Sequence, residues 1–160
     1  MASKALTIDT QSAKVSFVVK KLGLLKIKGS ITDFTGEVRF EKDALDKANF
    51  DVCVSPSTID TGNVKRDEHL KSEDFFHVNK HPQICFQSTS IQANSKGYQA
   101  IGKLTMVGVS KDVSIPFSLR GDVFKGEFSL NRSDFSLGNK FPAFIVGKTI
   151  HIYIECKITN

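Results

Sequence analysis

The feature that most restricts the fold of this chain is an alternation of apolar and polar residues with a period of two. Across residues 124–130, for example, Phe124, Phe128 and Leu130 share one parity, while lysine, glutamate and serine occupy the other. The same pattern recurs at 15–19, 27–31, 38–41, 50–55, 84–88, 113–119 and 150–158. Because successive side chains of a strand point to opposite faces, each stretch predicts a half-buried antiparallel strand.

About eight such strands joined by short connections favour a closed antiparallel barrel or a two-sheet sandwich. The alternation alone does not distinguish the two. Pro116 lies on the polar parity of its strand and predicts a sheet edge or a bulge there, because proline has no N–H to donate. The 160 residues fit one domain, 1–160, that can bury close to 70% of its unfolded surface.

The chain as written favours a cytoplasmic location. No stretch of 18 consecutive residues is apolar, and the first residues, MASKALTIDTQ, have no apolar core of a signal peptide. A periplasmic or exported location is expected instead if a signal peptide was removed.

One short helix is predicted from Val64 to Asp74. Asn63 suits the N-cap, and Asp67 and Lys71 are spaced as an acid-before-base pair four residues apart. So short a helix needs tertiary contacts to persist. We expect its apolar side, formed by Leu70, Phe75 and Phe76, to dock across one end of the barrel.

The cysteines and histidines give no sign of a disulfide framework or a metal site. Cys53, Cys85 and Cys156 are odd in number and widely spaced, which predicts three reduced, hydrophobic residues. His69 and His81 flank His77, but Pro82 and the absence of an intervening carboxylate argue against a metal-binding pair. No metal and no cofactor are expected.

Catalysis and nucleic-acid binding are also not expected. The chain has no Gly-x-Ser-x-Gly pattern and no glycine-rich loop leading from strand to helix, so no catalytic residue is predicted. The net charge of +5 is spread along the chain, and the thirteen phenylalanines fall mostly on the apolar parity. The positive charge is equally suited to solubility or to contact with an anionic lipid surface.

Three segments resemble one family. They are the run from Arg66 to Phe76 (RDEHLKSEDFF), LTMVGVSKDV at 104–113 and NRSDFSL at 131–137. Together they resemble the YceI family of lipocalin-like barrels, whose members bind polyisoprenoid or similar long-chain lipids. The resemblance implies an all-β fold, a single eight-stranded antiparallel barrel with one short capping helix, and a ligand such as an isoprenoid quinone, a polyprenyl lipid or a fatty acid, held for storage or transport.

The interior of an eight-stranded barrel holds either packed side chains or one slim ligand. The size of the inward-facing residues determines which of the two is present. Glycine and other small residues on the apolar parity predict a tunnel with apolar walls. The candidate ligand-binding residues are Phe17, Val19, Phe40, Phe86, Gly102, Leu104, Met106, Phe117, Phe128, Ile152 and Phe144. The alternative is a packed core in which phenylalanines fill the space that glycine leaves.

The connector 135–146, FSLGNKFPAFIV, is unusually apolar and must cover the barrel mouth, a lipid tail or a partner subunit. A lid, a homodimer contact and a transient membrane contact all remain open. Arg66 and Arg132 are expected to pin loops through hydrogen bonds, or else to bind a ligand headgroup. A rival function is a ligand-free stress-response or interaction module that uses this loop as its interface.

Overall fold

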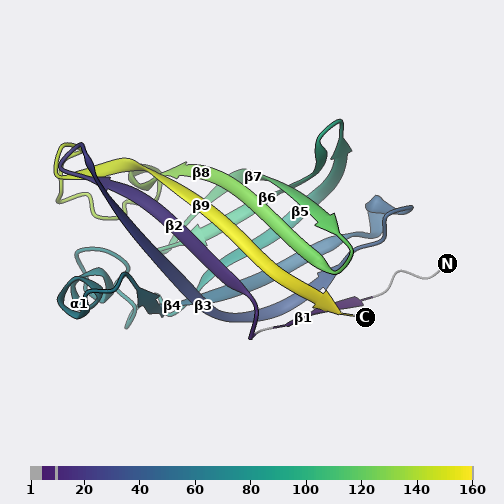
Figure 1. Ribbon diagram of the computed structural model, residues 1–160, viewed down its shortest axis with the longest axis horizontal. Coiled ribbons are helices and arrows are strands. Elements are labelled where there is room, and N and C mark those ends of the chain that lie inside the picture. Colours follow the sequence, from purple (N-terminus) through teal and green to yellow (C-terminus); the bar gives the residue numbers. More distant parts are fainter. Residues whose placement is uncertain (1–4, 10, 160) are drawn as a thin grey trace.

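The computed structural model describes residues 5–9 and 11–159, and within them nine strands form one antiparallel sheet that closes on itself (Figure 1). The strands are β1 (Ala5–Ile8), β2 (Lys14–Lys21), β3 (Leu25–Arg39), β4 (Asn49–Asp60), β5 (Ile84–Asn94), β6 (Gly97–Met106), β7 (Val109–Arg120), β8 (Val123–Asn131) and β9 (Val146–Thr159). The helical elements are α1 (Val64–Lys71) and two 3₁₀ turns, η1 (Leu45–Lys47) and η2 (Arg132–Phe135).

Eight strands make the barrel wall, as predicted. The order runs from β3 through β2, β9, β8, β7, β6 and β5 to β4, and pairing between β3 and β4 closes the ring. The short β1 bridges β3 and β9 at one end. The choice between barrel and sandwich, which the alternation left open, is therefore settled in favour of the barrel.

The wall is interrupted where β7 and β8 separate. Their pairing covers only four residue pairs and stops at Phe117 opposite Gly126. The next residue of β7 is Pro116, which has no N–H with which to continue the ladder. The sheet interruption predicted at Pro116 is confirmed.

The helix begins at Val64, as predicted, but ends at Lys71 rather than Asp74. The side chain of Asn63 accepts the backbone N–H of Arg66 and caps the first turn. Lys71 pairs with Glu68 at 3.3 Å, so the predicted pairing of Lys71 with Asp67 is wrong. Among the described helices, none has the length and apolar character needed to cross a membrane.

The prediction of three reduced cysteines is wrong for two of them. Cys53 on β4 lies directly opposite Cys85 on β5, their Cα atoms are 4.1 Å apart, and the side chains form a disulfide. Sequence spacing hid this pair because the partners are 32 residues apart and meet only through strand register. Cys156 is free and buried, as expected.

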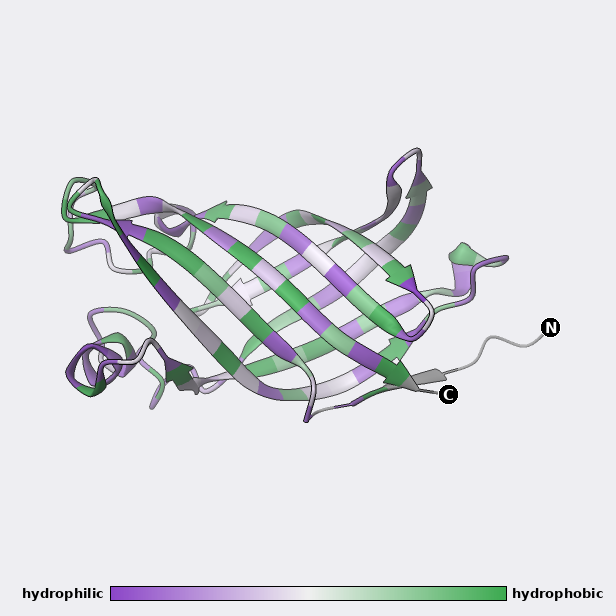
Figure 2. Cartoon of the chain, in the orientation of Figure 1, coloured by the Kyte–Doolittle hydropathy of each residue, from purple (hydrophilic) through white to green (hydrophobic). Residues whose placement is uncertain are grey.

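Figure 2 shows the hydrophobic and hydrophilic residues alternating along the wall, as the sequence pattern requires. The interior has two halves. At the end where β9 finishes, five aromatic side chains fill the barrel with ring centroids 4.9–6.1 Å apart. They are Phe40, Phe50, Tyr98, Phe117 and Phe124. This aromatic floor closes one end of the barrel, and the apolar cavity lies in the other half.

Candidate functional site: an apolar cavity under a cap

The open half of the barrel contains a cavity with a volume of about 160 Å³. Its walls come from inward residues of all eight wall strands, β2 to β9, and its roof comes from the chain around α1 and from the β8–β9 connection. Nearly all lining side chains are aliphatic or aromatic, and among the described lining residues only Arg132 carries a charge. Such a space suits a hydrocarbon group and offers little to a polar one.

Seven of the eleven candidate ligand-binding residues line this cavity. They are Phe17, Val19, Phe86, Leu104, Met106, Phe128 and Ile152. Phe17, Phe128 and Ile152 lie opposite one another across three neighbouring strands, because Ile152 pairs with Phe17 on one side and Phe128 on the other. Whether these side chains contact a ligand remains a prediction.

The other four candidates lie elsewhere. Phe40 and Phe117 belong to the aromatic floor, where they pack edge to face at 6.1 Å. Phe144 is 71% exposed and points away from the barrel interior. Parity assigned the first two to the correct face, but it carries no information on depth along the barrel axis.

Gly102 is not an open wall of a tunnel, and its assignment is wrong. The β5–β6 register shifts between Ser88 and Ser90, which brings the β5 backbone over Gly102. A Cβ atom at Gly102 would collide with the carbonyl oxygen of Gln87 and lie 2.7 Å from the Cα of Ser88. The glycine is required for this close approach of two strands.

Several cavity residues were missed by the sequence reasoning. Val15, Ile31, Val54, Ile150 and Ile154 lie on the apolar parity of the alternating stretches 15–19, 27–31, 50–55 and 150–158, so the alternation could have identified them. Val146 begins β9 with the same parity as Ile150, whereas Leu137 could not be found in this way, because it comes from a connection whose path the sequence pattern does not reveal.

The roof is built from two segments that we call the mouth cap, namely residues 64–76 and residues 132–146. Phe75 is buried, and its ring stacks on that of Phe141 with centroids 5.1 Å apart and an angle of 7°. His69 packs edge-on against both rings, at 5.3 and 5.6 Å. Leu70, Phe75 and Phe76 line the cavity, so the predicted docking of the helix side across one end of the barrel is confirmed, and the two segments of the cap also contact each other.

Arg132 organises the second segment of the mouth cap. Its side chain is only 2% exposed, and its guanidinium donates five hydrogen bonds to main-chain carbonyls. The acceptors are Gly147 (3.0 Å), Leu137 (3.1 Å), Gly138 (2.7 Å), Phe141 (2.6 Å) and Val146 (2.7 Å). Burial lowers the pKa of Arg132 from its ordinary value.

A guanidinium has five N–H donors, so Arg132 has none left for a ligand headgroup. The anchoring role predicted for this residue is confirmed, with carbonyls as its partners. Arg66 is also an anchor: its Nε and Nη2 donate to the side-chain and main-chain oxygens of Thr61, both at 2.8 Å. The backbone N–H of Thr61 in turn donates to Asp67, which ties the start of α1 to the end of β4.

A polar cluster joins the two segments at the surface. His69 Nε2 lies 2.8 Å from Asp74 Oδ2, and Lys140 Nζ lies 3.5 Å from Asp74 Oδ1. The hydrogen bond from His69, followed by the charge of Lys140, holds the pKa of Asp74 below its ordinary value. Across the described part of the chain, no three His, Cys, Asp or Glu residues are grouped so as to hold a metal ion.

The fold and the cavity together define a lipocalin-like barrel with a capped apolar interior. The YceI-like domain model matches residues 6–158, and the chain therefore belongs to the YceI-like family. The resemblance noted in the three sequence segments is confirmed.

Related sequences and solved structures agree with this family assignment and with the barrel fold. A UPF0312 protein of Yersinia enterocolitica is 39% identical over 115 residues, which are 71% of this chain and 59% of that relative. The crystal structure of BcnA from Burkholderia cenocepacia has a TM-score of 0.87 at 24% identity and covers 96% of this chain and 100% of its own. A polyisoprenoid-binding domain from Saccharophagus degradans has a TM-score of 0.70 at 11% identity, over 99% of each chain.

Proposed function

We propose that this protein binds one long-chain lipid, with an isoprenoid or acyl tail in the apolar cavity, for storage or transport. The observation that carries the proposal is the cavity itself, which lies inside the barrel wall, is lined almost entirely by hydrocarbon and is roofed by a separate cap. The Saccharophagus degradans neighbour, described as a polyisoprenoid-binding domain, supports an isoprenoid tail. A role in binding rather than catalysis is supported by a lining that offers no acid, base or nucleophile in position to react.

The volume of the cavity bears on how a long tail is accommodated. A cavity of about 150 Å³ lined by Leu, Ile and Phe holds a molecule the size of benzene, so the 160 Å³ present here holds only a short length of chain. A longer tail requires the mouth cap to move outward, because the aromatic floor blocks the opposite direction. Lipid entry is therefore coupled to the Phe75–Phe141 contact that joins the two segments of the cap.

The disulfide bears on location. Disulfides persist in oxidising compartments and are rare in a reducing cytosol. The Cys53–Cys85 bond therefore supports a periplasmic or extracellular site of action over the cytoplasmic one expected from the sequence as written. Trapping free thiols by alkylation in intact cells tests this: both cysteines should be protected, and full alkylation of both would contradict it.

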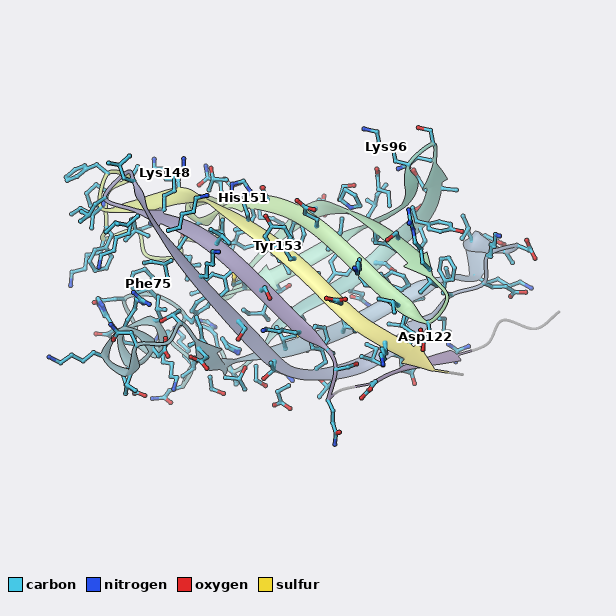
Figure 3. All side chains as sticks on the ribbon, viewed as in Figure 1. Phe75, Lys96, Asp122, Lys148, His151 and Tyr153 are labelled. Atoms are coloured by element: carbon cyan, nitrogen blue, oxygen red, sulfur yellow. A yellow bond between two sulfur atoms is a disulfide. The ribbon has the colours of Figure 1, made fainter. Side chains whose placement is uncertain are left out.

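Neighbouring residues of β9 give a matched test of the cavity. Ile152 lines the cavity, whereas Tyr153 faces outward and is 41% exposed (Figure 3). Ile152→Trp should fill the cavity and weaken binding of a fluorescent long-chain fatty acid by about tenfold or more, since the added ring occupies the space for the tail. Tyr153→Trp should bind as the unaltered protein does.

Thermal unfolding of both variants shows whether the barrel is intact. Competition by an isoprenoid quinone, a polyprenol and a fatty acid ranks the tail classes. If Ile152→Trp folds and binds the probe with unchanged affinity, the ligand does not occupy this cavity and the proposal is wrong.

A further inference from the structure

Exposed apolar side chains gather at the mouth end of the barrel. The turn between β2 and β3, residues 21–25, which we call the hairpin tip, carries Leu22, Leu24 and Leu25 with exposures of 57%, 89% and 59%. Phe144 is 71% exposed and belongs to the adjacent connection. The backbone N–H of Leu22 donates to the carbonyl of Ile145 at 3.0 Å, which holds the two segments side by side (Figure 1).

The hairpin tip is an unfavourable place for leucine unless something covers it. Leu22 has a φ of 54°, and Gly23 follows with a φ of 77°. This left-handed region favours glycine or asparagine, and neither of these residues exposes a hydrocarbon side chain to water. Leu22 therefore combines a disfavoured backbone conformation with an exposed hydrocarbon side chain, and Leu24 is almost fully exposed beside it. Such a patch is typical of an interaction site.

The charge of the hairpin tip and of the segments beside it is positive, and the acidic groups of this end, among them Glu68, Glu73 and Asp74, lie in the first segment of the mouth cap. The two joined segments, 14–32 and 135–154, contain no Asp or Glu. Their exposed lysines near the tip are Lys20, Lys21, Lys26, Lys28, Lys140 and Lys148. Within the described residues, only Lys140 of these has an acidic oxygen within 4 Å. Figure 3 places Lys148 at this end and Lys96 and Asp122 at the opposite end.

Exposed leucine and phenylalanine ringed by lysine match the interface of an anionic lipid bilayer. The apolar side chains fit the boundary between headgroups and acyl chains, and the lysines fit the anionic headgroups. A second copy of this chain is a poorer match, because a two-fold contact would bring lysines against lysines.

The geometry points to end-on docking of the mouth end onto an anionic membrane, and we propose that the hairpin tip and Phe144 enter the headgroup layer. The patch is continuous with the cavity: Val19 on β2 and Val146 on β9 both line the cavity close to the tip. Docking would thus bring the mouth cap to the source of the lipid. The purpose of docking rests on the proposed lipid-binding function, but docking itself does not require a ligand in the cavity.

The chain has no tryptophan, so a single one can report insertion. Leu24→Trp keeps the tip apolar, and Tyr153→Trp places the reporter on the side of the barrel. With vesicles of phosphatidylcholine plus about 30% phosphatidylglycerol at low salt, the emission of Leu24→Trp should shift to the blue and be quenched by brominated acyl chains. Tyr153→Trp should show neither effect, and vesicles of phosphatidylcholine alone should bind weakly.

Charge and hydrophobicity are then separated by substitution. Lys20→Gln and Lys26→Gln should each weaken co-sedimentation with anionic vesicles about fivefold at low salt. Lys96→Gln at the far end should have no effect, and Leu24→Ser should weaken binding severalfold. Each variant is also assayed for binding of the fluorescent fatty acid without vesicles, so a failure of docking is distinguished from a failure of the cavity.

Three results would overturn the proposal. One is binding to vesicles that does not depend on anionic lipid, and another is a Leu24→Trp spectrum unchanged by vesicles. The third is a shift from dimer to monomer in light scattering of Leu24→Ser with vesicle binding unchanged, which would make the patch a contact between copies.

Discussion

Replacement of Arg132 tests the account of how the mouth cap is held. Arg132→Met keeps an unbranched apolar stem but removes all five hydrogen bonds to the carbonyls of residues 137–147. A hydrogen bond from a charged donor contributes about 1.5–3 kcal/mol, so five give a gross contribution of about 7–15 kcal/mol. Burial of the unpaired guanidinium charge offsets much of this.

The net loss is smaller, because the segment can relax and water can reach some of the freed carbonyls. We expect Arg132→Met to lower the free energy of unfolding by about 3–5 kcal/mol, the usual cost of removing one partner from a buried charged network. That is a large part of the 5–15 kcal/mol of an ordinary domain. Arg132→Lys should be intermediate, since an ammonium group has three donors for five acceptors.

Urea unfolding, with amide hydrogen exchange at residues 135–146, measures this effect. Arg66→Met is the control: Arg66 donates two hydrogen bonds, both to Thr61, and is only partly buried, so a loss of about 1–2 kcal/mol is expected. If the cap undocks locally while the barrel stays folded, exchange in 135–146 should rise strongly with little change in the urea midpoint. Neither a lower midpoint nor faster exchange in Arg132→Met would refute the anchoring role.

Four further predictions follow from single residues. Gly102→Ala should lower the free energy of unfolding by about 2 kcal/mol or more in urea unfolding, through collision with the β5 backbone, and unchanged stability would contradict the close approach. Phe141→Ala should speed exchange of a fluorescent lipid severalfold by loosening the cap, and an unchanged rate would remove the aromatic stack from the entry step. Burial, with a smaller contribution from the charge of Glu155, raises the pKa of Cys156 to about 11. A thiol reagent near neutral pH should therefore detect no thiol in the folded protein and one thiol after unfolding without reductant. A reactive thiol in the folded state would contradict this. The pKa of Asp74 is lowered in the folded state, so the contribution of Asp74 to stability is present above its ordinary pKa and is lost as the pH falls through the lowered value. The difference in melting temperature between Asp74→Asn and the unaltered protein should be full above about pH 5 and shrink below about pH 4. A difference that does not depend on pH would contradict the shift.

The strands were predictable because alternation is a local property, whereas the barrel was expected only from the resemblance to the YceI family. Each strand's parity assigns its inward face, and Pro116 marked the place where β7 and β8 part. The start of α1 was also predictable, since the cap at Asn63 depends on residues only three positions apart.

The errors within the barrel involve position along its axis or register between strands. Phe40 and Phe117 face inward but fill the floor, because depth depends on how strands are staggered. Gly102 and the Cys53–Cys85 pair depend on which residues of two strands lie opposite each other. A one-residue bulge changes that register, and the pattern of apolar residues in one strand does not record it.

The central claim is that the capped cavity holds one lipid tail. Purification under native conditions, followed by native mass spectrometry and lipid analysis of an organic extract, tests it most directly. The account predicts about one molecule of an isoprenoid or acyl lipid per chain, reduced strongly in Ile152→Trp and retained in Tyr153→Trp. A folded protein that carries no lipid and takes none up from quinone, polyprenol or fatty-acid mixtures would contradict it.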